Sequence, residues 1–270
     1  MTRTAIVTGA GSGLGRAICL RLARDGWHLA LADVDIHGAA ETLRLVREAG
    51  GDGRVEPLDV TSEEQWTSLK SRLQEDWPQL DLLVNNAGIG ASGELGTFSL
   101  EQWRRVMDVN LWGVIYGCHC MVDWLKQNPH GAHLINTASF AALATAPSMG
   151  GYNVSKAGVL ALSETLYGEL QPYGIGVTVI CPLFFRTNLL KDWPAGSEIE
   201  RRAAEFYTDQ ADFTAEDVAN AAVRAMQRKQ LYVIMGRKAR WYWRMKRLMP
   251  RTFLKLISYK YSSWVKNAAK

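Results

Sequence analysis

The stretch TGAGSGLG, residues 8–15, follows an apolar β-branched run and leads directly into a helical pattern. Gly9, Gly13 and Gly15 permit a tight turn and a close approach of backbone to a pyrophosphate. The free N–H groups at the N-terminus of the following helix would stabilise that anion. A glycine-rich loop between a strand and a helix therefore predicts a dinucleotide-binding βαβ unit at the start of the chain.

Apolar β-branched runs alternate with helical patterns along the rest of the chain, as is typical of a parallel sheet covered by helices on both faces. Right-handed crossovers from a first strand that carries a nucleotide loop predict an α/β, single-domain, Rossmann-type doubly wound sheet of order 3-2-1-4-5-6-7. We expect strands at Thr4–Thr8, His28–Ala32, Arg54–Pro57, Leu80–Asn85, Ala132–Ala138, Gly176–Cys181 and Tyr232–Met235, and helices at Leu14–Asp25, Ile36–Ala49, Ser62–Trp77, Leu100–Gln127, Gly151–Tyr173 and Ala215–Lys229, the last capped by Thr214 with Asp217.

A second motif is YNVSK, residues 152–156. Tyr152 and Lys156 share one face of a helix because they are four residues apart. A fixed ammonium beside the phenol would lower the tyrosine pKa from about 10 and make the group useful in acid–base catalysis near neutral pH. Ser139, in NTASF at the end of the fifth expected strand, would hold the substrate oxygen. The alternative is an ordinary exposed Tyr and Lys on an amphipathic helix.

Asp33 ends the second expected strand, eighteen residues after Gly15. A carboxylate at that place accepts hydrogen bonds from the adenosine ribose hydroxyls and repels a 2′-phosphate. No Lys or Arg stands in residues 8–15 or at Val34 to offset the repulsion. The sequence therefore predicts NAD rather than NADP as cofactor. The alternative is an incidental turn carboxylate shared with Asp35.

Together, in this order and at these intervals, the motifs resemble the short-chain dehydrogenase/reductase family, from Thr4 to about Met235. The resemblance implies an NAD(P)-dependent oxidoreductase. In it Tyr152 is the acid and base, Lys156 also binds the nicotinamide ribose, and Ser139 orients the carbonyl or alcohol. Asn110, in VMDVNLWG, matches the asparagine that holds a proton-relay water in the family.

The resemblance also implies a set of cofactor contacts. Residues 85–88 read NNAG and match the family segment that lines the adenine side and stabilises the sheet, and Asp59 with Val60 matches the acidic and apolar pair beside the adenine ring. After the sixth strand the chain reads PLFFRT, residues 182–187, where the family usually has a glycine after the proline; Leu183 leads us to expect a different loop backbone. Thr187 matches the residue that binds the nicotinamide carboxamide. The implied cofactor-binding residues are Gly9, Ser12, Gly13, Leu14, Gly15, Asp33, Asp59, Val60, Asn86, Ala87, Gly88, Tyr152, Lys156, Pro182 and Thr187.

The segments that the family places around the substrate cleft are apolar. Such walls suit a hydrophobic secondary alcohol or ketone, such as a steroid, a terpenoid or a fatty chain. Ordinary core and lid packing would give the same composition. The expected substrate contacts are Ser139, Phe140, Met149, Leu183, Phe184 and Trp193, with Leu143 and Phe185 in the same segments.

The composition limits which classes of protein this chain can belong to. The chain has 270 residues and is 47% hydrophobic, enough for one large domain with a well-buried core. We expect a cytoplasmic protein, since no signal-peptide apolar region precedes the first strand and no run approaches the ~20 apolar residues of a membrane span. The four cysteines lie in expected helices or a strand and form no CxxC, which disfavours a disulfide framework. Cys118 and Cys120 point to different sides of a helix, so we expect no metal.

Residues 237–270 form a separate electrostatic segment, with eleven Lys or Arg and no Asp or Glu, whereas residues 1–236 carry a net charge of −7. We expect residues 1–236 to be the oxidoreductase domain and residues 237–270 to be a basic amphipathic helical extension, here called the tail. Its apolar stripes are Trp241, Met245, Leu248 and Met249, then, beyond a break at Pro250, Phe253, Leu256, Ile257, Tyr261 and Trp264.

Three uses of the tail compete. Aromatic and basic residues on amphipathic helices are typical of helices that lie on an anionic membrane surface. The stripes would serve equally to cover the cleft or a neighbouring subunit of a homodimer or homotetramer. Nucleic acid is disfavoured, because no recognition motif is visible.

The sequence as a whole predicts an NAD(H)-dependent oxidoreductase that interconverts a hydrophobic secondary alcohol and its ketone. A 3-oxoacyl or hydroxysteroid reductase is the main alternative among enzymes. A non-catalytic nucleotide-binding regulator or scaffold is the alternative from another class; such proteins usually lose the tyrosine or the lysine, and this chain keeps both.

Overall fold

The computed structural model describes residues 2–183, 185, 202 and 211–268. At its centre lies a parallel sheet in the order β3-β2-β1-β4-β5-β6-β7, which confirms the Rossmann-type topology expected from the sequence. The strands are β1 Thr4–Thr8, β2 His28–Asp33, β3 Asp52–Pro57, β4 Leu82–Asn85, β5 His133–Thr137, β6 Gly176–Ile180 and β7 Tyr232–Val233. All five residues of β1, β5 and β6 are buried, as strands covered on both faces must be.

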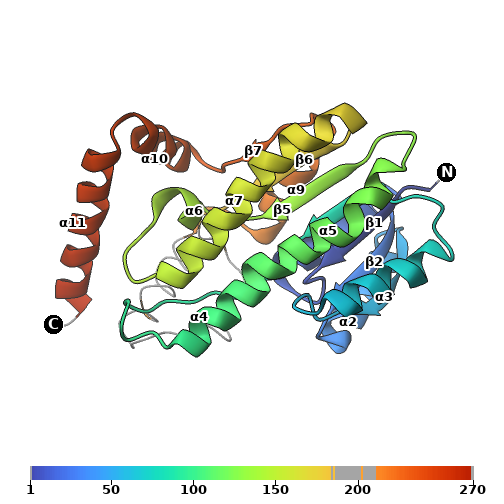
Figure 1. Cartoon of the computed structure of the whole chain (residues 1–270), viewed down its shortest axis with the longest axis horizontal. Coiled ribbons are helices and arrows are strands. Elements are labelled where there is room, and N and C mark those ends of the chain that lie inside the picture. Colours follow the sequence, from blue (N-terminus) through green and yellow to red (C-terminus); the bar gives the residue numbers. More distant parts are fainter. Residues whose placement is uncertain (1, 184, 186–201, 203–210, 269–270) are drawn as a thin grey trace.

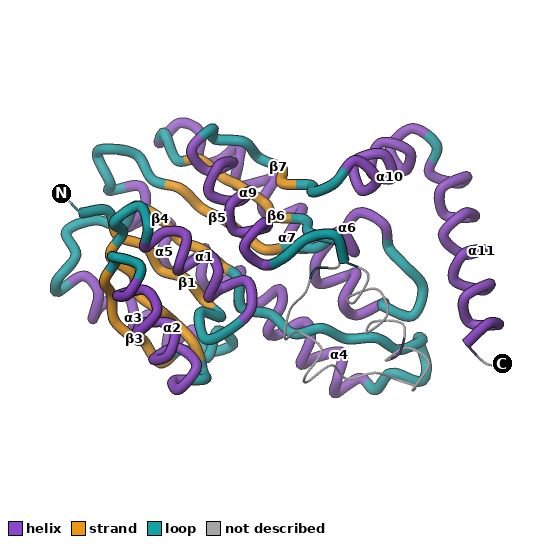
Figure 2. Tube along the Cα trace, turned by 180° about the vertical axis from the view of Figure 1, so that it is seen from behind, coloured by secondary structure: helices purple, strands orange, loops and turns teal. Residues whose placement is uncertain are grey.

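Helices cover both faces of this sheet (Figures 1 and 2). On one face α3, α5 and α7 pack around Trp66, Trp124 and Val159, and on the other α1 and α9 pack around Ile18 and Val223. The helices are α1 Gly13–Ala23, α2 Ile36–Glu48, α3 Glu63–Gln74, α4 Leu100–Met107, α5 Gly113–Lys126, α6 Phe140–Ala144, α7 Gly150–Leu170, α9 Ala215–Gln227, α10 Arg237–Leu248 and α11 Pro250–Ala268.

Helix α9 begins with the capping box that the sequence predicts. The Thr214 hydroxyl accepts a hydrogen bond from the Asp217 N–H at 3.2 Å, and the Asp217 carboxylate accepts one from the Thr214 N–H at 2.9 Å. Two orphan N–H groups of the first turn are thereby satisfied.

The helices differ from those expected in two places close to the candidate active site described below. The single helix expected at Leu100–Gln127 is interrupted by a π-helical turn, η1, at Asp108–Trp112. That turn contains the fully buried Asn110, and π turns inside helices are common at functional sites. The short helix α6 was not expected, because five residues are too few to show a helical period.

The tail folds onto the body of the molecule. Phe253 of α11 is fully buried, and Tyr242 and Trp243 of α10 pack against the core that contains α7. α10 ends at Leu248 and α11 begins at Pro250, so the break between the helices falls at the expected place. The first predicted stripe is only partly buried: Met245 packs against the core, whereas Trp241 and Leu248 are 55% and 80% exposed.

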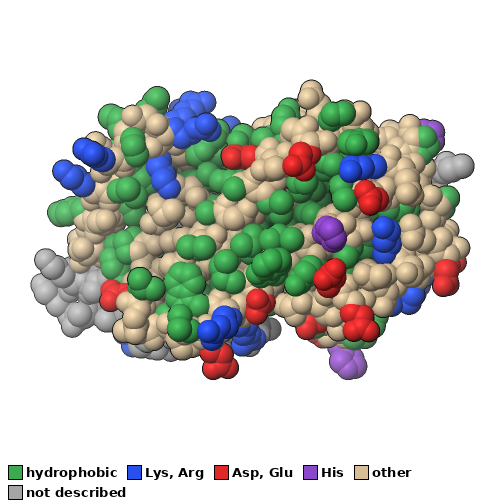
Figure 3. All heavy atoms as spheres, viewed as in Figure 1, with side chains coloured by type: hydrophobic (Ala, Val, Ile, Leu, Met, Phe, Trp, Pro, Cys, Tyr) green, Lys and Arg blue, Asp and Glu red, His purple; other side chains and the backbone are tan. Residues whose placement is uncertain are grey.

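On the outer side of the tail, basic and hydrophobic side chains lie next to each other (Figure 3). No helix within residues 2–183 or 211–268 is long and apolar enough to cross a membrane.

Candidate active site

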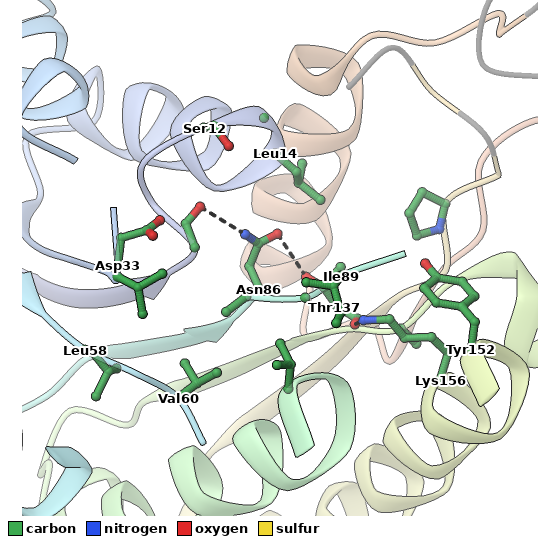
Figure 4. Close-up of a pocket in the computed structure, with 18 of the residues that line it drawn as sticks. Ser12, Leu14, Asp33, Leu58, Val60, Asn86, Ile89, Thr137, Tyr152 and Lys156 are labelled. Carbon is green, nitrogen blue, oxygen red and sulfur yellow. Dashed lines mark hydrogen bonds between the residues drawn. The ribbon is translucent and has the colours of Figure 1, made fainter. Parts of the chain in front are cut away.

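A cavity of about 400 Å³ opens at the carboxyl ends of the strands, the usual ligand position in a doubly wound sheet. The glycine loop and Asp33 line one end, and Tyr152 and Lys156 line the other (Figure 4). Thirteen of the fifteen residues expected to contact a cofactor line it: Gly9, Ser12, Gly13, Leu14, Asp33, Asp59, Val60, Asn86, Ala87, Gly88, Tyr152, Lys156 and Pro182.

The glycines of the loop are required by its geometry. Gly9 and Gly13 have φ angles of +66° and +51°, a region that strongly favours glycine. A Cβ on Gly15 would lie 1.9 Å from the Gly9 carbonyl oxygen, so Gly15 lets α1 pack closely against the loop although it does not line the cavity. Ser12, the N-cap of α1, makes no side-chain capping bond. The first N–H groups of α1 are therefore suited to hold a phosphate.

Asp33 fixes the loop from the end of β2. Its carboxylate accepts hydrogen bonds from the Gly11 N–H at 2.7 Å and the Asp35 N–H at 2.9 Å. Asp35 has a different task, since its own carboxylate caps α2 by accepting from the Gly38 N–H at 3.0 Å. The two carboxylates are therefore not interchangeable turn residues, and only Asp33 lines the cavity.

Asn86 joins three strands beneath the cavity (Figure 4). Its amide donates to the Thr8 carbonyl at 3.0 Å, and its carbonyl oxygen accepts from the Thr137 hydroxyl at 3.4 Å. Because Thr8 ends β1 and Thr137 ends β5, Asn86 holds the ends of β1, β4 and β5 in register. Its side chain is used for structure, which leaves the neighbouring Ala87 and Gly88 to form the cavity wall.

Tyr152 and Lys156 lie on adjacent turns of α7, as their spacing predicts, and the exposed-helix alternative is wrong. Their exposed fractions are 8% and 3%. The Lys156 ammonium donates to the Thr137 carbonyl at 3.0 Å and lies 5.8 Å from the centre of the Tyr152 ring. A strand end and a helix face therefore place both groups at one end of the cavity.

The electrostatics of this pair correct our expectation. Burial raises the Tyr152 pKa, and a hydrogen bond with Ser139 lowers it by less. Burial also lowers the Lys156 pKa to about 8, because desolvation disfavours the ammonium. We expected the cation to depress the tyrosine pKa; burial raises it instead, and the hydrogen bond that opposes this rise comes from Ser139 rather than from Lys156.

Ser139 and Asn110 do not line the cavity, but each forms a hydrogen bond with a residue that does, Ser139 with Tyr152 and Asn110 with Ile89. Ser139 is the N-cap of α6, where its hydroxyl accepts from the Ala141 N–H at 3.1 Å. The Asn110 side chain pairs twice with Ile89, donating to its carbonyl and accepting from its N–H, each at 2.8 Å. Asn110 therefore shapes the cavity through Ile89, which lines it.

The expected substrate contacts fall in different places. Phe140 is buried against Tyr242 of the tail, with ring centres 6.4 Å apart, and Leu183 is partly buried against the core. Met149 is the N-cap of α7. Phe184, Thr187 and Trp193 lie outside the described residues.

Eight cavity-lining residues were not expected. Most could have been found by their position, because they adjoin expected residues at the ends of β2, β3, β4, β5 and β6. Arg105 and Val109 come from α4 and η1, and no local signal identifies them. The eight are Val34, Leu58, Ile89, Arg105, Val109, Thr137, Ala138 and Phe185.

The family model for short chain dehydrogenases matches residues 3–198. The chain is a short-chain dehydrogenase. It is an oxidoreductase of the short-chain dehydrogenase/reductase family, whose members bind a nicotinamide cofactor. A crystallised short-chain dehydrogenase/reductase from Burkholderia phymatum, in complex with NAD, is 35% identical, with a TM-score of 0.80 over 86% of this short-chain dehydrogenase and 88% of that chain.

Two curated relatives match this chain over different lengths. The probable oxidoreductase EphD of Mycobacterium tuberculosis is 37% identical over 184 residues, which are 68% of this short-chain dehydrogenase; the match spans only 31% of EphD. The 3beta-hydroxysteroid dehydrogenase 1 of Eggerthella lenta is 34% identical over 86% of this chain and 89% of its own length.

Proposed function

We propose that this short-chain dehydrogenase interconverts a hydrophobic secondary alcohol and its ketone with NAD(H). One observation carries the proposal: Tyr152, Lys156 and the Thr137 carbonyl lie at the end of the cavity opposite the glycine loop and Asp33. The catalytic unit is residues 1–236, and the tail extends it.

The chemistry follows from the positions of the side chains. When bound, the nicotinamide supplies or accepts the hydride. Tyr152 donates a proton to the carbonyl oxygen in reduction and takes it back in oxidation, and Ser139 orients that oxygen by a hydrogen bond. A pKa raised by burial keeps the phenol protonated near neutral pH, the form needed to protonate a carbonyl. Lys156, held by Thr137, binds the ribose, and Asn110 holds the relay water.

The preference for NAD rests on Asp33. Its carboxylate is held by two backbone N–H groups at the edge of the cavity, so a negative charge is fixed where a 2′-phosphate would lie. Two neighbouring negative charges repel strongly where water is partly excluded. Ribose hydroxyls, in contrast, can donate to the same carboxylate.

The substrate class rests on the apolar residues around the site and on the similarity to a hydroxysteroid dehydrogenase. The experiment is a screen of hydrophobic alcohols with NAD and of ketones with NADH, followed at the absorbance of the reduced cofactor. Turnover of a steroid, terpenoid or fatty alcohol supports the proposal. Tight NAD binding with no turnover of any of them would instead favour the regulator or scaffold.

We also propose that the protein is a homodimer or homotetramer located in the cytoplasm. There the outer face of the tail would lie on anionic lipid. Trp241, Leu248 and Met249 are exposed there among basic residues, and no acidic residue lies within 237–270. Each Lys or Arg near an anionic surface contributes about 1 kcal/mol, which salt screens. The full chain should sediment with phosphatidylserine vesicles at low salt and not with neutral vesicles. Absence of binding to the anionic vesicles rules this location out.

A further inference from the structure

The connection between α6 and α7, residues 145–149, is here called the substrate loop. It connects the two helices that carry candidate catalytic residues. Ser139 is the N-cap of α6, and Tyr152 lies in the first turn of α7. The conformation of this loop therefore bears on how the helices that carry Ser139 and Tyr152 lie relative to each other.

Two residues of the substrate loop adopt a conformation that they disfavour. Thr145 and Ser148 have φ angles of 52° and 56°. Left-handed backbone is uncommon for residues other than glycine, and a β-branched residue such as threonine is a clear outlier there. Such residues persist only where surrounding contacts hold them, and they concentrate at functional sites.

The tail contacts both of these residues. The Lys246 ammonium of α10 donates to the Thr145 hydroxyl at 3.3 Å, and the Tyr261 hydroxyl of α11 pairs with the Ser148 hydroxyl at 2.5 Å. Lys246 is partly buried, and burial lowers its pKa. Figures 1 and 2 show α11 standing beside the connection that leaves α6.

The tail is itself anchored next to Ser139. The ring of Phe140, the residue that follows Ser139, lies 6.4 Å from Tyr242 of α10, and Tyr242 packs edge-on against the fully buried Phe253 of α11 at 6.0 Å. Lys260 donates to the Tyr242 hydroxyl at 2.7 Å, which joins the two tail helices.

On its other side the substrate loop is bound to the start of α7. The Asn153 amide donates to the Ala146 carbonyl at 2.7 Å, and the Asn153 N–H donates to the Met149 carbonyl at 2.7 Å. The Gly93 N–H donates to the Ser148 carbonyl at 2.6 Å. A movement of Ser148 would therefore pass to Asn153, the neighbour of Tyr152 on α7.

We propose that Lys246 and Tyr261 are positioning residues that hold the substrate loop in its left-handed conformation, and that the tail thereby sets substrate affinity without touching the cofactor. Neither residue lines the nucleotide cavity. The effect on substrate rests on the proposed function, whereas the effect on the loop does not. The substrate class concerned is the bulky apolar alcohol or ketone of the proposed function, whose oxygen must reach both the Ser139 and the Tyr152 hydroxyl.

The first test needs no substrate. Hydrogen exchange is followed in peptides covering residues 141–152 of the full chain, in Lys246→Met and Tyr261→Phe. The matched controls are Lys255→Met and Tyr259→Phe, exposed residues of the same kinds on α11; Tyr259 is 74% exposed. Loss of one hydrogen bond should accelerate exchange about fivefold in the two test variants and in neither control.

A double-mutant cycle isolates the contact. Tyr261→Phe should accelerate exchange in the parent chain and have little further effect in a Ser148→Ala background, because the shared hydrogen bond is already gone. Additive effects of the two substitutions, or equal exchange in Tyr261→Phe and Tyr259→Phe, would overturn the proposal.

The second test uses the substrate found in the screen. KM for a bulky apolar alcohol should rise about three- to tenfold in Lys246→Met and Tyr261→Phe, while NAD affinity stays within twofold. A higher KM for the alcohol with unchanged NAD affinity distinguishes loop positioning from general destabilisation, because destabilisation would weaken the binding of both the alcohol and NAD. If no compound is turned over but exchange responds as expected, the proposed function fails and the positioning role stands. If turnover is found and KM and exchange do not change, the positioning role fails alone.

Discussion

The Lys156 ammonium lies 5.8 Å from the centre of the Tyr152 ring and donates a hydrogen bond to the Thr137 carbonyl at the end of β5. Both side chains are almost completely buried. Burial therefore favours the neutral form of each group: it raises the pKa of the Tyr152 phenol and lowers the pKa of the Lys156 ammonium. Ligands that bring charge into the site will act on two groups whose charged forms burial already disfavours.

Replacing Tyr152 with phenylalanine should lower kcat by about 10²- to 10⁴-fold, because only the transferable proton is removed. NAD affinity should stay nearly unchanged. Tyr167→Phe, on the exposed side of the same helix, is the control and should keep full activity. The measurement is steady-state kinetics with the substrate from the screen, together with NAD titration. Full activity of Tyr152→Phe would remove this residue from the mechanism.

Lys156→Met should lose cofactor affinity as well as turnover, and it should change how stability depends on pH. The folded-state pKa of about 8 lies below the ordinary 10.5, so the folded chain binds fewer protons than the unfolded chain between those values. The free energy of unfolding of the parent chain should therefore rise with pH through this window, relative to the variant, by about 3 kcal/mol. Urea unfolding of both chains at several pH values measures the difference; a constant difference contradicts the shifted pKa.

NAD should bind more tightly than NADP, and Asp33→Asn should reduce that preference. Loss of the charged acceptor removes about 1.5–3 kcal/mol, or roughly tenfold to a hundredfold in NAD affinity, and relieves the repulsion of the 2′-phosphate. Asp35→Asn is the control, since that side chain caps α2 and asparagine caps a helix about as well, so the substitution should leave the ratio of NAD to NADP affinity unchanged. Titration of both cofactors decides the matter. Equal affinity for NAD and NADP in the parent chain would deprive Asp33 of its assigned role.

Phe253→Ala should destabilise the full chain by about 3–5 kcal/mol, because it leaves a cavity under a completely buried ring. Leu254→Ala, at an adjacent position that is 43% exposed, should change stability by about 0.5 kcal/mol or less. Denaturant unfolding compares the two. Similar small effects would mean that the tail does not fold with the core.

Local patterns were sufficient for the fold and for most of the nucleotide end of the site. The glycine loop, the alternation of strands and helices, and Asp33 at a strand end each depend on neighbours within a few residues. Periodicity also identified the breaks around Pro250 and the cap at Thr214. The π turn at Asn110 was not predicted. The side chain of Asn110 pairs with the backbone of Ile89, which is distant in sequence, so no local pattern indicates the turn.

By itself, the sequence determined the topology, the family and the face shared by Tyr152 and Lys156, because these follow from chain order, crossover handedness and helical period. Only the tertiary structure decided the direction of their pKa shifts, since desolvation depends on everything that surrounds a group. It also decided what the tail touches. The contacts of Lys246 with Thr145 and of Tyr261 with Ser148 join residues about a hundred positions apart, and no local pattern encodes such a pairing.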